Sequence, residues 1–476
     1  MAFWNRRKPI DTAAHFDSHT RLKPTLSWPH LVAMGVGAIV GTGIYTLTGI
    51  GAGLAGPAVI LSFLGCGVLC ACAAFCYTEM ATMIPASGSA YTYSYVVLGE
   101  AVAWIVGWSL ILEYTVAASA VAVGWSSHVA VLIQSAGLPV PDALLHGVMS
   151  GGIVDIPAIL ISLFVALLLI AGTRESATLN IVLVIIKVSA LVLFVWLAFQ
   201  SFDVARFHPF APFGYGAHPD HHGHNYGALG AAAILFFAFY GFDAVSTAAE
   251  ETKDPGRNLK IGIIGSMLIC TTLYVVVAAA ALGAVSYVLF SEAHNDTPLV
   301  FILKLLDYPV AAQLIAAAVT VALPTVILVL MYGQSRIFFV MARDGLLPQS
   351  LSTVHKTRGT PILMTAVTGI VVAAMASTLR LDEIALLANA GTLCAFVSVA
   401  VCMLVLRVRA PEQNRPFRAP MAWIVGPICI LGCLYLFLNG LPTFTQWWFL
   451  LWNGAGLLVY FLYGARSSNL AQTPGA

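Results

Sequence analysis

Residues 235–246 read LFFAFYGFDAVS, where a glycine and an aspartate interrupt an otherwise apolar segment. Residues 34–45 read MGVGAIVGTGIY, where Gly41 and Gly43 interrupt a second apolar segment on either side of Thr42. The apolar segments that contain these stretches, residues 226–250 and 28–53, are each long enough to cross a bilayer as a helix, which takes ~20 residues. Glycine tolerates backbone conformations that end a helix. The two stretches therefore predict two membrane-spanning helices that are broken near their centres.

The composition supports this membrane interpretation. Of the 476 residues, 59% are hydrophobic and 9% are charged, whereas soluble proteins carry about 25% charged residues. Apolar stretches recur along the chain, which predicts an all-α polytopic membrane protein with about twelve spans. The predicted spans cover residues 28–53, 57–83, 99–133, 154–172, 176–200, 226–250, 258–286, 308–340, 361–379, 382–408, 420–439 and 445–464.

Lysine and arginine are distributed unevenly between the two sides of these spans. With a cytoplasmic N-terminus, the cytoplasmic segments hold 18 of the 22 basic residues and the opposite segments hold 3. The positive-inside rule then places both termini in the cytoplasm. Residues 1–27 are polar and lack the apolar core of a signal peptide, so we expect a cytoplasmic segment there.

The two broken helices occupy the first and sixth spans. A shift of five spans is odd and reverses the direction of travel through the membrane. The breaks therefore lie at equivalent positions of two inverted halves, which is the sequence pattern of a transporter binding site at mid-membrane. The alternative is helix packing, because Gly37 and Gly41 form a GxxxG motif. The matching positions, with Asp243 in one break, favour a site.

The chemistry of a broken helix predicts the ligand. Unwinding at Gly41, Thr42 and Gly43 exposes backbone N–H groups and a positive dipole end, which suit a carboxylate. The carbonyl groups near Ile39, Phe237 and Tyr240 suit an ammonium group. A site with both kinds of group is shaped for an α-amino acid. The break itself is assigned to Gly241 and Asp243. We expect the Asp243 side chain to cap the helix that follows, and contact with the substrate or a proton is the alternative.

Lys187 lies in the apolar stretch 180–196, about 11 residues or ~17 Å from each end of its span. A charge at this depth costs at least a few kcal/mol, and such residues usually handle ions, protons or substrate. Snorkelling and a structural ion pair are the alternatives. We expect Lys187 to couple protons, as an ammonium group bonded to first-span carbonyls between Gly37 and Val40.

Glu113 is a second mid-depth ionisable residue, in the third span. Three functional roles are open: a counter-ion for Lys187, a proton relay on the extracellular side, or an acid that recognises cationic substrate side chains. A purely structural ion pair is the alternative to all three. Thr325 and Val329 are weaker candidates for lining the site. Glu79, Glu250 and Glu251 end two spans and are candidates for a cytoplasmic gate. They are equally well explained as solvated loop charges.

Several motifs now point to a known family. The stretches at 34–45, 77–100 (YTEMATMIPASGSAYTYSYVVLGE), 107–114 (GWSLILEY), 236–266 and 332–348 (YGQSRIFFVMARDGLLP) resemble the cationic amino acid transporter family. The chain is similar especially to bacterial members, within the amino acid–polyamine–organocation superfamily. The resemblance runs from about residue 25 to 440. The sixth-span motif with its following loop is specific, whereas a lone GTG is not.

This resemblance implies a five-plus-five inverted-repeat fold and alternating access. The transport core would cover 28–408, in halves 28–200 and 226–408, followed by two accessory helices at 409–464 and a cytoplasmic tail at 465–476. Phe237 matches the aromatic gate of the family, with Phe236 as the neighbouring alternative. Lys187 matches the lysine that replaces a sodium ion in proton-coupled relatives.

Other functions are disfavoured by missing motifs. No P-loop, HExxH motif or nucleophile elbow occurs, so we expect no catalytic residues and no cofactor beyond protons as the coupling ion. The loop 218–224 is rich in histidine and is a weak candidate for metal binding or pH tuning, so we assign no metal site. The net charge of +1 gives no sign of a nucleic-acid partner.

The leading hypothesis is a proton-coupled amino acid symporter in a bacterial inner membrane, with the lipid bilayer and an amino acid as its partners. Small neutral amino acids such as alanine are the expected substrates, and cationic ones stay open. The alternatives are an amino acid or polyamine exchanger on the same fold and a sensor that binds an amino acid without moving it. The sequence leaves the oligomeric state and any helper subunit open.

Overall fold

The structure is a computed structural model of the 476-residue chain. It describes residues 6–9, 26–171, 176–219, 225–289, 297–352 and 362–472. The helices before residue 200 are α2 (Trp28–Ile39), α3 (Thr48–Ala55), α4 (Val59–Met83), α5 (Ser89–Val97), α6 (Glu100–Ser135), α7 (Ile156–Ala171) and α8 (Ser176–Phe199). A small hairpin follows, made of β1 (His218–Pro219) and β2 (Asn225–Tyr226).

The rest of the described chain is again helical. Its helices are α9 (Ala228–Leu235), α10 (Ala244–Thr247), α11 (Pro255–Ala284), α13 (Pro298–Leu305), α14 (Pro309–Ala322), α15 (Pro324–Arg343), α16 (Ile362–Thr378), α17 (Leu381–Arg409), α18 (Ala422–Tyr435), α19 (Thr443–Val459), α20 (Ala465–Ser467) and α21 (Asn469–Gln472). Proline stands in the first turn of α2, α11, α13, α14 and α15. Its missing N–H costs nothing there, because the first N–H groups of a helix have no partner within it.

Apolar helices long enough to cross a membrane dominate the described residues. Nine segments meet this criterion, and α7 and α16 are shorter apolar helices. The segment Trp28–Met83 has 56 residues, more than twice the ~20 that one crossing requires. The predicted all-α polytopic class is therefore confirmed. The count of twelve spans and the inverted repeat stay predictions.

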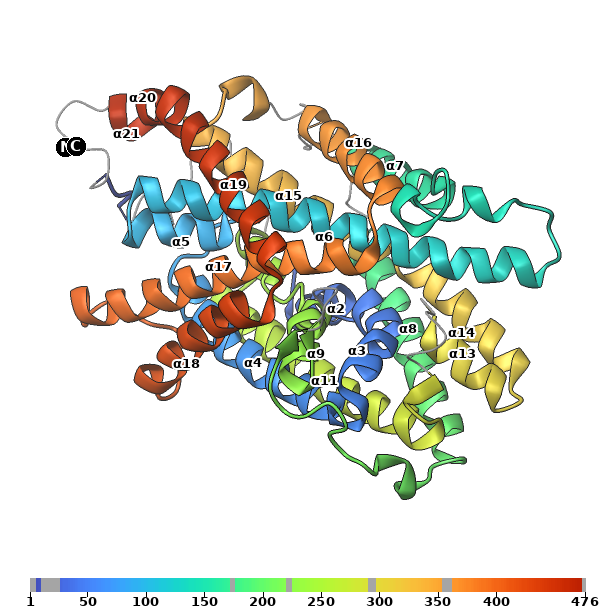
Figure 1. The fold of residues 1–476 in the computed structure, drawn as a ribbon. Coiled ribbons are helices and arrows are strands. Elements are labelled where there is room, and N and C mark those ends of the chain that lie inside the picture. The colour runs from blue at the N-terminus through green and yellow to red at the C-terminus, as the bar shows by residue number, and fades with distance from the viewer. Residues whose placement is uncertain are drawn as a thin grey trace.

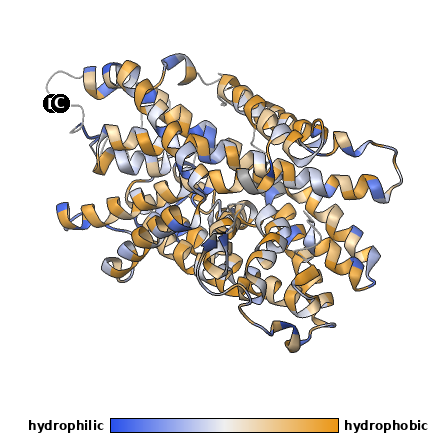
Figure 2. Cartoon of the chain, in the orientation of Figure 1, coloured by the Kyte–Doolittle hydropathy of each residue, from blue (hydrophilic) through white to orange (hydrophobic). Residues whose placement is uncertain are grey.

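The helices have two distinct ends in Figure 1. Helices α5, α20 and α21 lie at the left, which we call the α5 end, and the loop between α6 and α7 lies at the opposite end. Figure 2 shows mainly hydrophobic residues along the helices. Many of the large apolar side chains are exposed, as expected where lipid replaces water: Leu167, Trp196, Leu268, Trp423 and Leu462 are each more than 60% exposed.

Two groups of helices meet around the centre of the molecule. Helix α11 packs against α2, α4 and α10, and this set is the first group. Helix α6 packs against α7, α15 and α16, and this set is the second group. Helix α8 lies against α2 and α11, and α17 contacts both α4 and α6. Contacts between the two groups position the site described below.

Glu79 holds α4 to the end of α17 and to the segment that follows α17. Its carboxylate is 1% exposed and accepts hydrogen bonds from the Arg407 and Arg415 guanidinium groups and from the Ala419 N–H, the last at 2.7 Å. A buried carboxylate is tolerated when it is paired and bonded in this way. Glu79 is therefore not a solvated loop charge, and its role in a cytoplasmic gate stays a prediction.

Removing this carboxylate is expected to destabilise the protein strongly. Glu79→Ala would leave two arginines partly buried without their partner, and breaking a buried pair costs about 3–5 kcal/mol. Thermal unfolding of the detergent-solubilised protein measures the loss. Glu412→Ala, at an exposed position in the same segment, is the matched control. Equal midpoints for the two variants would contradict the assignment.

Candidate functional site

The first break separates α2 from the helical segment that begins at Gly43. Helix α2 ends at Ile39, and a π-helical turn, Gly43–Leu47, leads into α3. The last carbonyls of a helix lack partners within it. Here two side chains act as hydrogen-bond donors to these carbonyls. Lys187 Nζ donates to the Gly37 carbonyl oxygen at 2.8 Å, and the Tyr274 hydroxyl donates to the Ile39 carbonyl oxygen at 2.6 Å.

The other side of this break presents hydrogen-bond donors. The first N–H groups of the segment after Gly41 have no partner from a preceding turn, and they carry the positive end of its dipole. The Thr42 hydroxyl is fully buried and has no hydrogen-bond partner in the described part of the chain. Its methyl group packs against Gly124 of α6, where a side chain would clash with it. Thr42 is thus held in place with its hydroxyl available.

The second break lies between α9 and α10. A 3-10 turn, Phe236–Phe239, follows α9, after which Tyr240 is extended (φ −63°, ψ 143°) and Gly241 has φ +105°. Side chains disfavour this value of φ, so the glycine allows the chain to turn here. The predicted helix break at Gly241 and Asp243 is present.

The two breaks touch each other. A Cβ atom added to Gly43 would lie 2.3 Å from the Ala238 Cα, and one added to Gly241 would lie 2.6 Å from the Ala38 Cβ and 3.0 Å from the Ala38 carbonyl carbon. Each break thus brings a glycine against the backbone of the other. This reciprocal contact fixes the helix ends of the first and sixth spans around one space.

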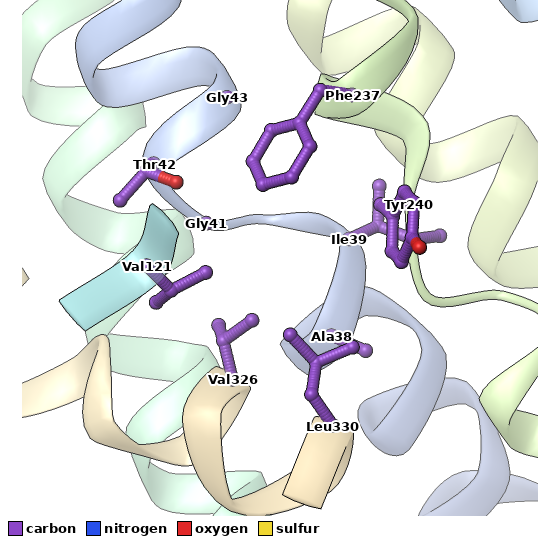
Figure 3. Close-up of a pocket in the computed structure, with 10 residues that line it drawn as sticks. All are labelled: Ala38, Ile39, Gly41, Thr42, Gly43, Val121, Phe237, Tyr240, Val326 and Leu330. Atoms are coloured by element: carbon purple, nitrogen blue, oxygen red, sulfur yellow. The ribbon is translucent and has the colours of Figure 1, made fainter. Parts of the chain in front are cut away.

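A cavity lies between the two breaks. Figure 3 shows Phe237 and Tyr240 from the sixth-span break facing the unwound first-span segment, and the Thr42 hydroxyl pointing toward the Phe237 ring. The free space is about 10 Å³, roughly what one water molecule needs. An amino acid therefore fits only after these side chains move apart. The lining residues are Ala38, Ile39, Gly41, Thr42, Gly43, Val121, Phe237, Tyr240, Val326 and Leu330.

All six residues expected to contact the substrate head groups line this cavity. Of the two candidate gates, Phe237 lines it, whereas Phe236 packs edge-on against Phe396 with ring centroids 5.8 Å apart. The register predicted for α15 is wrong by one residue, since Val326 and Leu330 face the cavity in place of Thr325 and Val329. The rotation of α15 about its axis depends on its packing against α6 and α2, which the sequence alone does not give.

Three residues of the site were not predicted from the sequence. Ala38 and Val121 line the cavity, and Tyr274 bonds the Ile39 carbonyl that we expected to face the substrate. A carbonyl oxygen has two lone pairs, so Ile39 can still accept a second hydrogen bond. Ala38 could have been found from its place next to Ile39. Tyr274 comes from α11, and only the tertiary fold brings it to α2.

Lys187 is fully buried on α8. Its ammonium group bonds Gly37, within the first-span stretch that we expected, and its own carbonyl oxygen accepts a hydrogen bond from the Tyr45 hydroxyl at 2.8 Å. Of the three roles left open for Glu113, a counter-ion for Lys187 is therefore wrong. Among the described residues Lys187 forms no ion pair, and neither carboxylate oxygen of Glu113 has a hydrogen-bond partner.

Asp243 does not act as we expected. It stands at the N-cap position of α10, but its side chain makes no capping hydrogen bond. Instead, one of its carboxylate oxygens accepts a hydrogen bond from the Tyr114 hydroxyl of α6. Helix α10 is only four residues long, so a cap is worth little there. The contact instead joins the first helix group to the second.

Polar bonds close the α5 end of the site. Glu251 Oε1 accepts hydrogen bonds from Arg336 at 3.1 Å and from the Tyr332 hydroxyl at 2.6 Å. Glu250 Oε1 accepts one from the Ser87 N–H at 2.9 Å. These contacts connect the sixth span to α15 and to the segment before α5, so Glu250 and Glu251 are not merely solvated loop charges, and their gate roles stay predictions.

No cluster of three metal-binding side chains occurs among the described residues. Most of the histidine-rich loop 218–224 lies outside them, so its candidate metal role has no structural description. The arrangement described above offers hydrogen-bond donors, carbonyl acceptors and apolar walls, and so it is suited to hold and release a small zwitterion.

A multi-pass helical protein with two broken helices around a closed central cavity belongs to the class of secondary transporters. The sequence matches the family model for amino acid permeases over residues 26–462. The chain therefore belongs to the amino acid permease family, and it is a transporter and not an enzyme.

Curated relatives agree with this assignment. The chain is 41% identical to the branched-chain amino acid permease BcaP of Bacillus subtilis (strain 168), over 98% of this chain and 99% of the relative. It is 40% identical to the methylthioribose transporter of the same organism, over 98% of each chain. Cationic amino acid transporter 2, vacuolar, of Arabidopsis thaliana is 37% identical over 86% of this chain and 64% of the relative. The predicted membership of the amino acid–polyamine–organocation superfamily is confirmed.

Proposed function

We propose that this permease imports neutral amino acids with small apolar side chains, such as alanine, together with protons. The observation that carries the proposal is the meeting of two broken helix ends at an apolar cavity. Donors at Gly41–Gly43 face the carboxylate of a substrate, and the carbonyls of Ile39 and Phe237 face its ammonium group. With both termini cytoplasmic, as the distribution of basic residues predicts, the α5 end faces the cytoplasm of a bacterial cell.

The cavity walls support a neutral side chain. Beyond the head-group contacts, the lining side chains are apolar and include Val121, Val326 and Leu330. An ammonium or guanidinium group placed against these walls would lose its hydration without gaining a partner. Glu113 does not line the cavity and lies eight residues before Val121 on α6, or ~12 Å along the helix axis. We therefore rank cationic amino acids below neutral ones.

The names of the relatives suggest two chemical classes of substrate. The branched-chain permease suggests an apolar amino acid, whereas methylthioribose is an uncharged sugar derivative. N–H groups with a positive dipole end on one side, and carbonyl oxygens that can accept a further hydrogen bond on the other, favour a ligand that carries both charges. This argument supports an amino acid for the present chain.

Proton coupling is assigned to Lys187. As an ammonium group it holds α2 to α8 through the Gly37 carbonyl. Loss of the proton to the cytoplasm weakens the contact and frees α2 to move. Amino acid exchange on the same fold is the second candidate, and it requires no change in the charge of Lys187.

Substrate binding is expected to stabilise the purified protein against heat. A ligand at 100 times its Kd adds about 2.7 kcal/mol. We expect a shift of the unfolding midpoint with L-alanine and little shift with L-arginine or methylthioribose. Thr42→Ala removes a hydrogen bond to a charged group, worth about 1.5–3 kcal/mol, and should raise the alanine concentration required by tenfold or more.

Thr48→Ala is the matched control, because the Thr48 hydroxyl bonds the Ile44 carbonyl within its own helical segment. Its alanine response should equal that of the wild type. A shift with arginine alone would establish a cationic substrate, and a shift with methylthioribose alone would exclude the amino acid assignment.

A further inference from the structure

Four basic side chains at the α5 end make no hydrogen bond or ion pair with the described residues. Lys253, Arg257 and Arg418 are exposed, and Lys260 is half-buried. The nearby Arg415 behaves differently, since its guanidinium group bonds the Glu79 carboxylate and several carbonyl oxygens. The charge of the four residues is therefore available to a partner outside the chain.

The four residues belong to two segments that touch each other. Three of them lie at the start of α11, and Arg418 lies between α17 and α18. A Cβ atom added to Gly256, the neighbour of Arg257, would lie 3.0 Å from the Pro416 Cβ. Pro416 stands two residues before Arg418, so this close packing brings both sets of charges to one surface. We call this surface the basic junction.

The part of the basic junction between α17 and α18 is held firmly against α4. The Phe417 ring stacks on Phe75 of α4, with ring centroids 6.4 Å apart, and the Ala419 N–H donates to the Glu79 carboxylate at 2.7 Å. Both neighbours of Arg418 are thus anchored, while Arg418 itself is exposed. A surface that is fixed before its partner arrives loses less entropy on binding.

The basic junction carries an excess of positive charge. Two exposed acids, Asp254 and Glu412, lie in the same two segments and offset only part of the charge of the four basic residues. Like charges gathered on one surface repel each other, and an anion that binds between them relieves this repulsion. The junction is therefore suited to an anionic partner.

Exposed apolar side chains place the basic junction at the membrane surface. Helix α18 begins four residues after Arg418, and Met421, Trp423 and Ile424 are 69%, 62% and 54% exposed. Large apolar side chains are exposed where they contact lipid, and tryptophan is common at the depth of the lipid head groups. The anion found at this depth is the phosphate of an acidic phospholipid, whose head group binds basic pockets between helices on the cytoplasmic side.

We propose that the basic junction binds the head group of an anionic phospholipid, with the phosphate between the start of α11 and Arg418. The lipid tails then lie along the exposed apolar residues at the start of α18. The bound lipid joins α11 to the segment between α17 and α18 and stabilises the protein at the α5 end. This binding does not depend on which substrate the permease carries.

Native mass spectrometry of the detergent-solubilised protein, titrated with phosphatidylglycerol, measures the Kd of the first bound lipid. We expect the wild type to bind phosphatidylglycerol at least tenfold more tightly than phosphatidylcholine. Each basic side chain near an anionic lipid contributes about fivefold to binding. Arg257→Gln combined with Arg418→Gln should therefore weaken phosphatidylglycerol binding by about 25-fold.

Arg7→Gln combined with Arg466→Gln is the matched control, because it removes the same net charge from two exposed arginines outside the basic junction. Its Kd should stay within twofold of the wild type. An equal loss of affinity in this control, or an unchanged Kd in the Arg257 and Arg418 variant, would overturn the proposal. Displacement of the lipid by excess inorganic phosphate would show a site for soluble anions instead.

Thermal unfolding provides a second measurement and a check on folding. Without added lipid, the Arg257 and Arg418 variant should unfold at the wild-type midpoint, because the replaced side chains make no bond to the described residues. Phosphatidylglycerol should raise the midpoint of the wild type, since a ligand that binds the folded state stabilises it. An equal rise in the variant would contradict binding at the basic junction.

Discussion

Replacing Lys187 by methionine is expected to abolish the accumulation of amino acid driven by a proton gradient while exchange of internal for external substrate continues. Methionine fills a similar volume and carries no charge. The Gly37 carbonyl would lose its hydrogen bond from the Lys187 ammonium. The protonation of this position would then no longer determine whether α2 is held to α8. Without that link, an imposed gradient has no means to drive uptake through Lys187.

Uptake into proteoliposomes with an inward proton gradient measures this effect. We expect accumulation in Lys187→Met to fall to the level of liposomes without protein, a loss of more than about 100-fold if the whole coupling energy of ~3 kcal/mol is removed. Retained exchange would show that the variant is folded. Lys304→Met, which removes an exposed lysine at the end of α13, should behave as the wild type. Full accumulation by Lys187→Met would refute the coupling role.

Adding a single methyl group at either helix break is the second substitution with a large expected effect. A Cβ atom on Gly43 would lie 2.3 Å from the Ala238 Cα, and the obstructing atoms include the backbone and not only the end of a flexible side chain. Gly241→Ala would meet Ala38 and would also strain a backbone with φ +105°. Either change forces the two helix ends apart by an ångström or more.

Displacement of about 1 Å in a binding site reduces activity by about 100-fold. We therefore expect alanine uptake by Gly43→Ala and Gly241→Ala to fall by at least that factor. The control is Gly65→Ala in α4, where a Cβ atom would meet nothing within 4 Å. It should transport normally, since alanine also favours a helix over glycine. Wild-type uptake by both break variants would show that the close contact between the breaks has no role in transport.

The sequence was informative where local chemistry decides the structure. Gly41, Gly43 and Gly241 mark the breaks because the chain needs residues without side chains there, and glycine is visible in one sequence. Lys187 stands out because a charge inside an apolar helix has few explanations. These features were enough to predict six of the residues that line the cavity between the two breaks.

The sequence was uninformative where contacts depend on helix rotation or on distant segments. Thr325 and Val329 lie one residue away from the cavity residues Val326 and Leu330, because the rotation of α15 is set by its packing against α6 and α2. Glu113 was assigned first to Lys187 on the basis of depth alone. The structure instead packs Glu113 against Gly391 of α17 and bonds Lys187 to the Gly37 carbonyl, because depth in the membrane does not determine which helices are neighbours.

The most direct test of the account is uptake of radiolabelled alanine and arginine by the wild-type protein in proteoliposomes with and without an imposed inward proton gradient. We predict that alanine accumulates above its external concentration only when the gradient is present, and that arginine does not accumulate. Alanine exchange that is unaffected by the gradient would contradict proton symport, and gradient-driven accumulation of arginine without alanine would contradict the apolar binding site.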